Sequence, residues 1–246
     1  MEQPCLLIHG FTGSVWEVEP LASYLRDHDC RPATFLLKGL GGTRRDMRGS
    51  TRLDWLRIAE EELEKLLRQY PRIHLIGFST GALIASHLAI RYPERISTLT
   101  LLAAPVYLFN GRVLLRSLTQ PHMLKNYARK LLSTPIQTAR EFKSMLMESN
   151  DIYSRIEMPT LVVQGDHDHI VRTESAHHIY RHLRTPAKKL LIVNNCGHMV
   201  CHHAASRSDI FEHVLRFVTQ VRAEQPDREG QSAPVPGLAG LQTLQP

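Results

Sequence analysis

The chain has 246 residues, of which 43% are hydrophobic and 22% are charged, and its formal net charge is +6. This composition excludes a chain that stays disordered throughout, and the length supports one sizeable core. No apolar stretch reaches the roughly 18 residues of a membrane span, and the basic groups at Arg44–Arg48 and Arg129–Lys130 lack interleaved aromatic residues. We therefore expect no stable membrane insertion and no nucleic-acid partner.

Short, mostly apolar runs alternate along the chain with longer amphipathic segments, and this alternation is typical of a parallel sheet that helices cover on both faces. The fold class that we predict is α/β, with a mostly parallel sheet of about six strands. The expected strands are Pro4–Ile8, Arg31–Leu36, Ile73–Gly77, Thr98–Ala103, Thr160–Gln164 and Lys188–Val193.

Five segments have the length and the apolar spacing of helices that pack on such a sheet. In the second of them, leucines recur at helical spacing and predict the buried stripe: Leu53, Leu56, Leu63, Leu66 and Leu67. The expected helices are Trp16–Asp27, Arg52–Gln69, Gly81–Tyr92, Arg172–Leu183 and Ser206–Arg222.

The stretch from about residue 106 to residue 157 is too long for a simple crossover and has a helical pattern, so it predicts a small inserted helical cap. Its apolar side chains can line a pocket for an acyl chain, or they can pack the cap onto the body, and packing is the reading that we favour. These side chains are Leu114, Leu115, Leu118, Met123, Leu124, Tyr127, Leu131, Leu132, Phe142, Met145, Leu146 and Met147.

Residues 1–222 are expected to form one domain, since the composition changes after Arg222 to Gln, Pro, Gly and Ala without an apolar period. We expect residues 223–246 to be a disordered tail. The four cysteines show no zinc or disulfide spacing, and residues Met1–Gly10 lack the features of a secretion signal. Reduced thiols in a cytoplasmic protein are expected.

A Gly-x-Ser-x-Gly motif stands where a predicted strand runs into a predicted helix, at Gly77-Phe78-Ser79-Thr80-Gly81. The glycines leave room for a sharp turn that exposes the Ser79 hydroxyl, and the helix N-terminus offers N–H groups to a developing anion. Alone, the motif is also compatible with an ordinary strand-to-helix turn capped by serine.

A serine hydroxyl needs a base, and His198 follows Gly197 in the loop after the last predicted strand. His202 and His203 are expected to begin the next helix as surface residues. The third partner must be a carboxylate after the preceding strand, and we choose Asp168 because it clears the strand end far enough to reach the imidazole. Asp166 is the alternative.

The alternating run Asp166-His167-Asp168-His169 is open to a second interpretation, as a metal cluster. It has no closed-site spacing, and neighbouring side chains in an extended loop point in different directions, so we predict no metal there. The order serine, aspartate, histidine, with acid and base each in a loop after a strand, favours nucleophilic catalysis.

The negative charge that develops on a carbonyl oxygen during such a reaction needs two fixed donors. The N–H of Thr80 is one by its position after the serine. The second is predicted to be the N–H of Phe11, in the glycine-flanked turn His9-Gly10-Phe11-Thr12-Gly13 that follows the first strand.

These motifs together resemble the α/β-hydrolase superfamily, and in particular its bacterial carboxylesterase and monoacylglycerol lipase branch, over about Pro4–Val221. The resemblance implies Ser79 as nucleophile, His198 as base and acid, Asp168 as orienting carboxylate, and donors at Phe11 and Thr80. It implies no metal or organic cofactor. It also implies a minimal six-stranded sheet, because the first strand here corresponds to the usual third strand.

One departure from the family is in the loop Lys38–Gly42, where Leu40 stands in place of a histidine that is common between the two glycines. This change affects the expected fit of the substrate rather than the chemistry. The expected partner is a small-molecule ester with an apolar acyl chain, and the sequence leaves the oligomeric state open. Thioester or carbon–carbon hydrolysis, acyl transfer, and slow or absent turnover in a ligand-binding protein stay open as alternatives.

Overall fold

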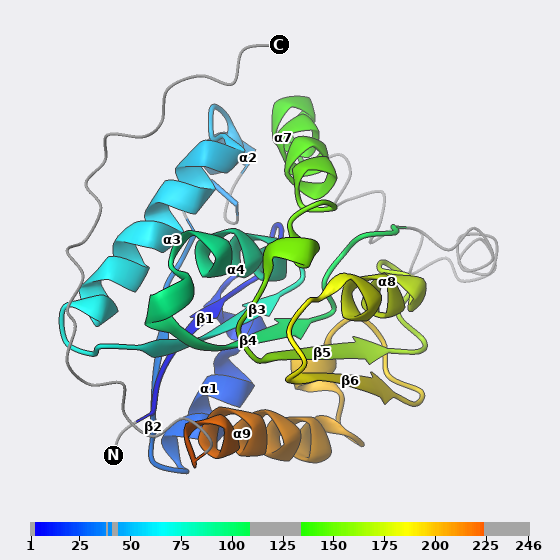
Figure 1. Cartoon of the computed structure of the whole chain (residues 1–246). Coiled ribbons are helices and arrows are strands. Elements are labelled where there is room, and N and C mark those ends of the chain that lie inside the picture. The colour runs from blue at the N-terminus through cyan, green and yellow to red at the C-terminus, as the bar shows by residue number, and fades with distance from the viewer. Residues whose placement is uncertain (1–2, 38, 41–43, 109–133, 224–246) are drawn as a thin grey trace.

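The structure of the protein is a computed structural model that describes residues 3–37, 39–40, 44–108 and 134–223. Six parallel strands form one sheet in the order β2-β1-β3-β4-β5-β6, so that β2 and β6 are its edges (Figure 1). The α/β fold class is thereby confirmed. The strands are β1 Gln3–Ile8, β2 Cys30–Thr34, β3 Ile73–Phe78, β4 Ile96–Leu102, β5 Thr160–Gly165 and β6 Lys188–Val193.

The helices cover both faces of this sheet: α1 and α9 lie on one face, and α3, α4 and α8 lie on the other (Figure 1). Their bounds are α1 Glu19–Arg26, α2 Arg44–Met47, α3 Arg52–Leu67, α4 Thr80–Arg91, α7 Ile136–Glu148, α8 Glu174–His182 and α9 Arg207–Ala223. Short 3-10 helices are Val15–Glu17, Pro93–Arg95, Tyr153–Arg155 and Val200–His202.

The central strands are mostly apolar because alternate residues enter two separate cores. In β1, Leu6 and Ile8 pack beneath α3 and α4, whereas Cys5 and Leu7 pack against α1 and α9.

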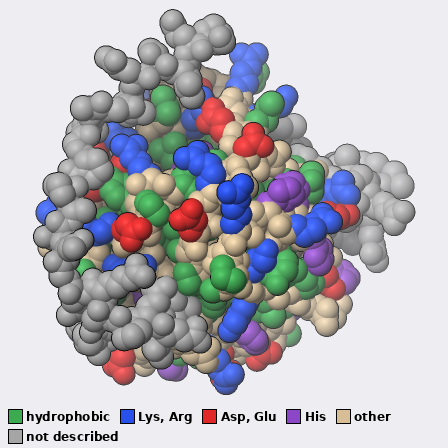
Figure 2. Space-filling model, in the orientation of Figure 1, with side chains coloured by type: hydrophobic (Ala, Val, Ile, Leu, Met, Phe, Trp, Pro, Cys, Tyr) green, Lys and Arg blue, Asp and Glu red, His purple; other side chains and the backbone are tan. Residues whose placement is uncertain are grey.

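On the face that Figure 2 shows, Lys and Arg side chains are interspersed with acidic and apolar ones, as the scattered basic residues of the sequence lead one to expect.

All six expected strands and all five expected helices are present, β6 with the expected bounds and the others with ends shifted by up to three residues. The largest change is in the first helix, which was expected from Trp16: a 3-10 turn comes first, and α1 begins only at Glu19, with Pro20 in its first turn, where proline is tolerated. The sequence also gives no sign of the four-residue α2. Segments of that length are too short to show a helical period.

The stripe expected for α3 is partly wrong. Leu53 is 54% exposed, whereas Trp55, Ala59 and Leu63 are fully buried and form the stripe at spacings of four residues. The helix begins with a capping box, in which Thr51 accepts from the Asp54 N–H and the Asp54 carboxylate accepts from the Thr51 N–H.

His202 and His203 do not begin the last helix, as had been expected. His202 ends the 3-10 helix Val200–His202, where it stacks on Trp16, and α9 starts at Arg207. Both histidines are partly buried rather than on the open surface.

Part of the expected cap lies in the described residues, where α7 is helical as the pattern predicts. Met145 and Phe142 pack on the core, whereas Met147 is 64% exposed. The other cap residues, from Leu114 to Leu132, and the tail from residue 224 lie outside the described residues, so the domain boundaries stay predictions. None of the helices among the described residues combines the length and the apolar character needed to cross a bilayer.

Two leucines of the same helix test the corrected stripe. Leu63→Ala removes a fully buried side chain and should lower the free energy of unfolding by about 2–5 kcal/mol. Leu53→Ala, at an exposed position, should change it by less than about 0.5 kcal/mol. Urea denaturation followed by circular dichroism measures both, and equal losses in the two variants would contradict the burial pattern.

Candidate active site

Ser79 occupies a strained turn between β3 and α4. Its φ of 53° and ψ of −119° lie in a region that few side-chain-bearing residues adopt. A Cβ on Gly77 would lie 2.4 Å from the carbonyl oxygen of Gly81, and a Cβ on Gly81 would lie 2.2 Å from that of Ile8. Only glycine fits at either position. The Ser79 N–H donates to the Leu102 carbonyl at 2.8 Å and ties the turn to β4.

The loops after β5 and β6 bring Asp168 and His198 to the same edge of the sheet as Ser79. Nε2 of His198 lies 3.2 Å from Oγ of Ser79, and Nδ1 of His198 lies 2.7 Å from Oδ2 of Asp168. The His198 ring packs against the Phe78 ring, with 5.1 Å between centroids. Three side chains that are 30 to 119 residues apart in the sequence thus form one hydrogen-bonded series.

The Asp168 carboxylate has four hydrogen-bond donors. Oδ1 accepts from the N–H groups of Ile170 and Val171, at 2.8 and 2.9 Å, and Oδ2 accepts from Nε2 of Gln164 and from His198. Burial acts to raise the pKa of Asp168, but the hydrogen bond and charge of His198 and the two backbone N–H groups outweigh it and hold this pKa below its usual value. The carboxylate is therefore ionised at neutral pH.

Asp166, the alternative carboxylate, points elsewhere. It accepts from Nδ1 of the exposed His167 at 2.7 Å, whereas the buried Asp168 accepts from His198. The four alternating residues 166–169 therefore do not converge. Within the described part of the chain, no group of three or more His, Cys, Asp and Glu side chains could hold a metal ion.

The turn that carries Phe11 is held through the imidazole of His9. The Leu37 N–H donates to Nε2 of His9 at 3.0 Å, so the ring proton is on Nδ1, which donates to the Gly10 carbonyl at 2.9 Å. Burial lowers the pKa of His9 and keeps this ring neutral. Because a trans peptide unit is planar, fixing the Gly10 carbonyl also fixes the direction of the Phe11 N–H on its other side.

Two further contacts hold the same turn. The buried Glu17 carboxylate accepts from the Gly10 N–H at 2.8 Å and fills the space where a Cβ on Gly13 would lie, 2.0 Å from it. The Leu40 carbonyl accepts from the Thr12 N–H at 2.7 Å, and the Leu40 side chain is fully buried. Leu40 thus supports the turn from behind.

Phe11 and Thr80, the two expected donors, lie on the two turns that meet beside Ser79: a Cβ on Gly10 would lie 3.1 Å from Cβ of Ser79. Among the residues that the structure describes, neither the Phe11 N–H nor the Thr80 N–H has a hydrogen-bond partner. Thr80 is the first residue of α4, where backbone N–H groups have no partner inside the helix.

The cysteine thiols near the site are protonated at neutral pH. Burial, with a contribution from nearby carboxylates, raises the pKa of Cys196 to about 11 and that of Cys201 to about 12. A protonated, buried thiol is a poor nucleophile, which leaves the Ser79 hydroxyl as the group placed to react beside His198.

Sequence reasoning missed the supporting residues Glu17 and Gln164, and it assigned no role to His9. A glutamate near a glycine-rich turn is ordinary on a protein surface, so the residue type alone carries no signal. Only the buried position of Glu17, 8% exposed, reveals its contact with the turn.

Comparison with known proteins places the chain among ester-cleaving relatives. Residues 5–212 match the sequence profile described as "Alpha/beta hydrolase family". The chain is 25% identical over 214 residues to a carboxylesterase of Bacillus subtilis (strain 168), covering 81% of this chain and 85% of the relative. It is 27% identical over 204 residues to a thermostable monoacylglycerol lipase of Bacillus sp. (strain H-257), covering 79% and 82%.

A solved structure extends the likeness of fold. The monoacylglycerol lipase of Paleococcus ferrophilus superposes with a TM-score of 0.70 at 15% identity, over 89% of this chain and 94% of that chain. The resemblance drawn from the sequence motifs is thus confirmed at the level of family and fold.

The lowered pKa of Asp168 predicts how stability responds to acid. The ionised carboxylate stabilises the fold above its unfolded pKa of about 3.9, and this contribution is lost as the pH falls through the lower folded value. The stability advantage of the wild type over Asp168→Asn should therefore shrink between about pH 5 and about pH 3 in urea denaturation.

The matched control is Asp151→Asn, since Asp151 is exposed on the surface. Its difference from the wild type should stay nearly constant over the same range. An advantage of Asp168 that stays constant or grows toward acid would contradict the account of its carboxylate.

Proposed function

This chain belongs to the alpha/beta hydrolase family, and from that premise we propose that it is a serine hydrolase that cleaves carboxylic esters through an acyl-enzyme on Ser79. The observation that carries the proposal is the buried series in which Ser79, His198 and Asp168 lie within 3.2 and 2.7 Å of one another. The names of two relatives, a carboxylesterase and a monoacylglycerol lipase, support the ester as substrate.

In the first step, Oγ of Ser79 attacks the ester carbonyl carbon while Nε2 of His198 takes the hydroxyl proton. The ionised Asp168 accepts from Nδ1, which leaves Nε2 unprotonated and facing the serine. The same carboxylate then stabilises the imidazolium that forms. Gln164 and two backbone N–H groups hold that carboxylate in place.

The carbonyl oxygen becomes negative in the tetrahedral intermediate, and the N–H groups of Phe11 and Thr80 are proposed to donate to it. Fixed donors of this kind cost no reorganisation during the reaction, and each is worth roughly 2.7–4 kcal/mol of barrier. The hydrogen bonds of His9 and Glu17 to Gly10 support the proposal because they orient the turn before substrate arrives.

Collapse of the intermediate breaks the bond to the alcohol, which leaves with the proton from Nε2 of His198. Water then attacks the acyl-enzyme, gives its proton to the same nitrogen, and the acid leaves as Oγ of Ser79 is protonated again. Groups of this chain supply every proton transfer in the scheme. Because all four cysteines are free thiols, we propose that the reaction takes place in a reducing cytoplasm.

Replacement of the nucleophile is the direct test. Ser79→Ala should reduce turnover of a chromogenic short-acyl ester by at least about 10³-fold. The thermal midpoint should stay the same or rise, because the substitution removes only the hydroxyl that lies against His198. Ser86→Ala is the matched control, since Ser86 lies on α4, which begins directly after Ser79, and its hydroxyl donates to the Ala82 carbonyl of that helix. Residual Ser79→Ala activity within about tenfold of wild type would refute the assignment.

The same assay separates the alternatives. Rapid ester turnover by the wild type supports the esterase. Labelling by a fluorophosphonate without turnover indicates an acyl-enzyme with a different substrate, such as a thioester. Absence of both indicates a binding protein that retains the fold.

The expected substrates carry an apolar acyl chain. We expect initial rates across monoacylglycerols and simple esters to rise with chain length before falling, because an apolar pocket gains about 0.8 kcal/mol for each buried CH₂ until it is filled. Rates that do not depend on chain length would contradict an acyl pocket.

A further inference from the structure

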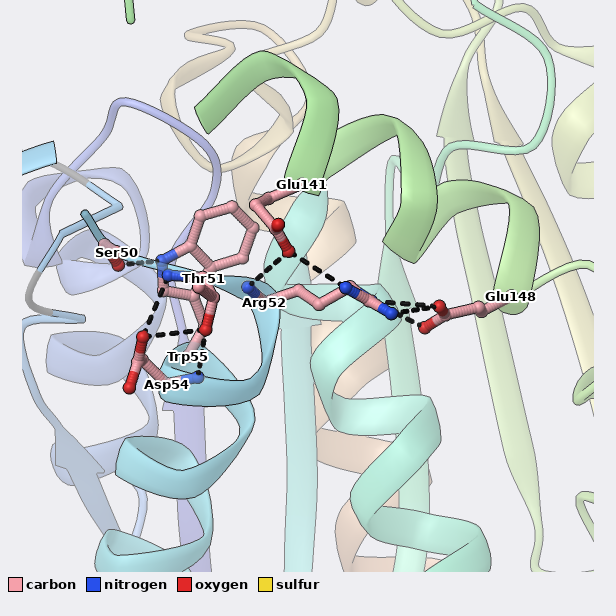
Figure 3. Close-up of polar contacts among 7 residues, drawn as sticks. All are labelled: Ser50, Thr51, Arg52, Asp54, Trp55, Glu141 and Glu148. Carbon is pink, nitrogen blue, oxygen red and sulfur yellow. Dashed lines mark hydrogen bonds and ion pairs between the residues drawn. The ribbon is translucent and has the colours of Figure 1, made fainter. Parts of the chain in front are cut away.

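Helix α7 is joined to the start of α3 by a single arginine (Figure 3). The guanidinium of Arg52 pairs side-on with both oxygens of Glu148, its Nε donating at 2.9 and 3.0 Å and a terminal nitrogen lying 2.7 Å from Oε1. Its other terminal nitrogen donates to Glu141 at 3.0 Å. Glu141 and Glu148 are two turns apart on α7, so both face α3.

The arginine is itself held in place, which makes the pair geometrically specific. Its backbone N–H also donates to Glu141 at 3.1 Å, and it follows the capping residue Thr51 directly. The hydrogen bond to Glu148 is the largest contribution that raises the pKa of Arg52. A two-oxygen contact of this kind fixes orientation as well as distance.

Two more polar contacts hold the ends of α7. The Thr138 hydroxyl donates to the Met47 carbonyl at 2.9 Å near the start of the helix. After its last turn, the ring of His87 on α4 lies 3.1 Å from the hydroxyl of Ser149. Arg52 holds α7 at Glu148, its last residue, and at Glu141, which directly precedes Phe142.

Phe142 connects α7 to the candidate active site. Its ring is stacked on the ring of Phe11, with centroids 4.9 Å apart and an interplanar angle of 26°. On another side, the fully buried Trp55 meets the Phe11 ring edge-on at 6.3 Å, and Trp55 is held by a hydrogen bond from its Nε1 to Ser50. The Phe11 side chain is therefore clamped between α3 and α7.

We propose that Arg52 is a positioning residue that holds Phe142 of α7 against Phe11 and so keeps the Phe11 N–H aligned with the developing oxyanion. The inference rests on the proposed function, because it assumes that this N–H is a donor in the reaction. His9 and Glu17 orient the turn through the backbone of Gly10. Arg52 acts on Phe11, the next residue, through the contact between the Phe142 and Phe11 side chains. Loss of Arg52 thus loosens a donor and leaves the hydrogen bonds of Ser79 and His198 in place.

The ion pairs of Arg52 are partly exposed, so the contribution of Arg52 to turnover should depend on the salt concentration. The side chains of Arg52 and Glu148 are 27% and 45% exposed. At 1 M salt the screening length falls to about 3 Å, so the attraction between them weakens. Wild-type turnover should move toward that of an Arg52 variant under these conditions.

The test compares Arg52→Met with Arg57→Met, a matched control whose ion pair with Glu61 lies on the outer surface of the same helix. We measure kcat and KM for a chromogenic ester per active site titrated with a fluorophosphonate, together with inhibition by a trifluoromethyl ketone, which forms a tetrahedral adduct. Melting curves confirm that each variant is folded at the assay temperature.

Arg52→Met should lower kcat about tenfold and weaken ketone inhibition by a similar factor, with KM changed by less than about threefold, since complete removal of such a donor costs about 10²–10³-fold. Phe142→Leu, which keeps an apolar contact but not the stacking, should shift both values in the same direction. Arg52→Lys should recover part of the loss, because it restores one ion pair. Arg57→Met should match the wild type.

Equal kcat and ketone inhibition in Arg52→Met and Arg57→Met would overturn the inference and leave the proposed function standing. The inference would also be overturned if Arg52→Met had fewer active sites that react with the fluorophosphonate but an unchanged kcat per site. A purely structural role of Arg52 predicts that result. If Arg52→Met does not fold, Glu148→Gln takes its place with the same expected direction. A wild type that cleaves no ester overturns the proposed function and this inference with it.

Discussion

The close approach of two backbones at Gly81 is the constraint on which the site depends. The first turn of α4 lies so near the end of β1 that a methyl group would collide with the carbonyl of Ile8. This proximity places the turn after β3 beside the turn after β1. Ser79, the proposed nucleophile, and Phe11, the proposed second donor, therefore lie on adjoining turns.

The strain at Ser79 has to be balanced by its surroundings. Backbone conformations of this kind cost of the order of 1–3 kcal/mol and persist only where neighbouring structure imposes them. Here β3 is buried on both faces at the centre of the sheet, and its exit is bonded to β4. The central strands are therefore where such a turn can be maintained, and the loops after β5 and β6 carry Asp168 and His198, the proposed carboxylate and base.

The sequence predicts those features that depend on local pattern or on chain order. Parallel strands produce short, mostly apolar runs, and all six expected strands are present. The reach argument selected Asp168, which the structure places against His198. The prediction that Leu53 is buried was wrong, because a count of leucines ignores Trp55 and Ala59, whose spacing defines the buried stripe of α3. Contacts such as Arg52 with α7 join residues 89 to 96 positions apart and leave no local trace.

The two edge strands have a consequence for behaviour at high concentration. An uncovered edge offers free backbone groups that can recruit a strand from another molecule. β2 contains Arg31 and Pro32, and proline has no N–H to offer, whereas β6 starts with Lys188 and Lys189. Such residues disfavour strand pairing between molecules, so both edge strands of the sheet carry residues that oppose aggregation.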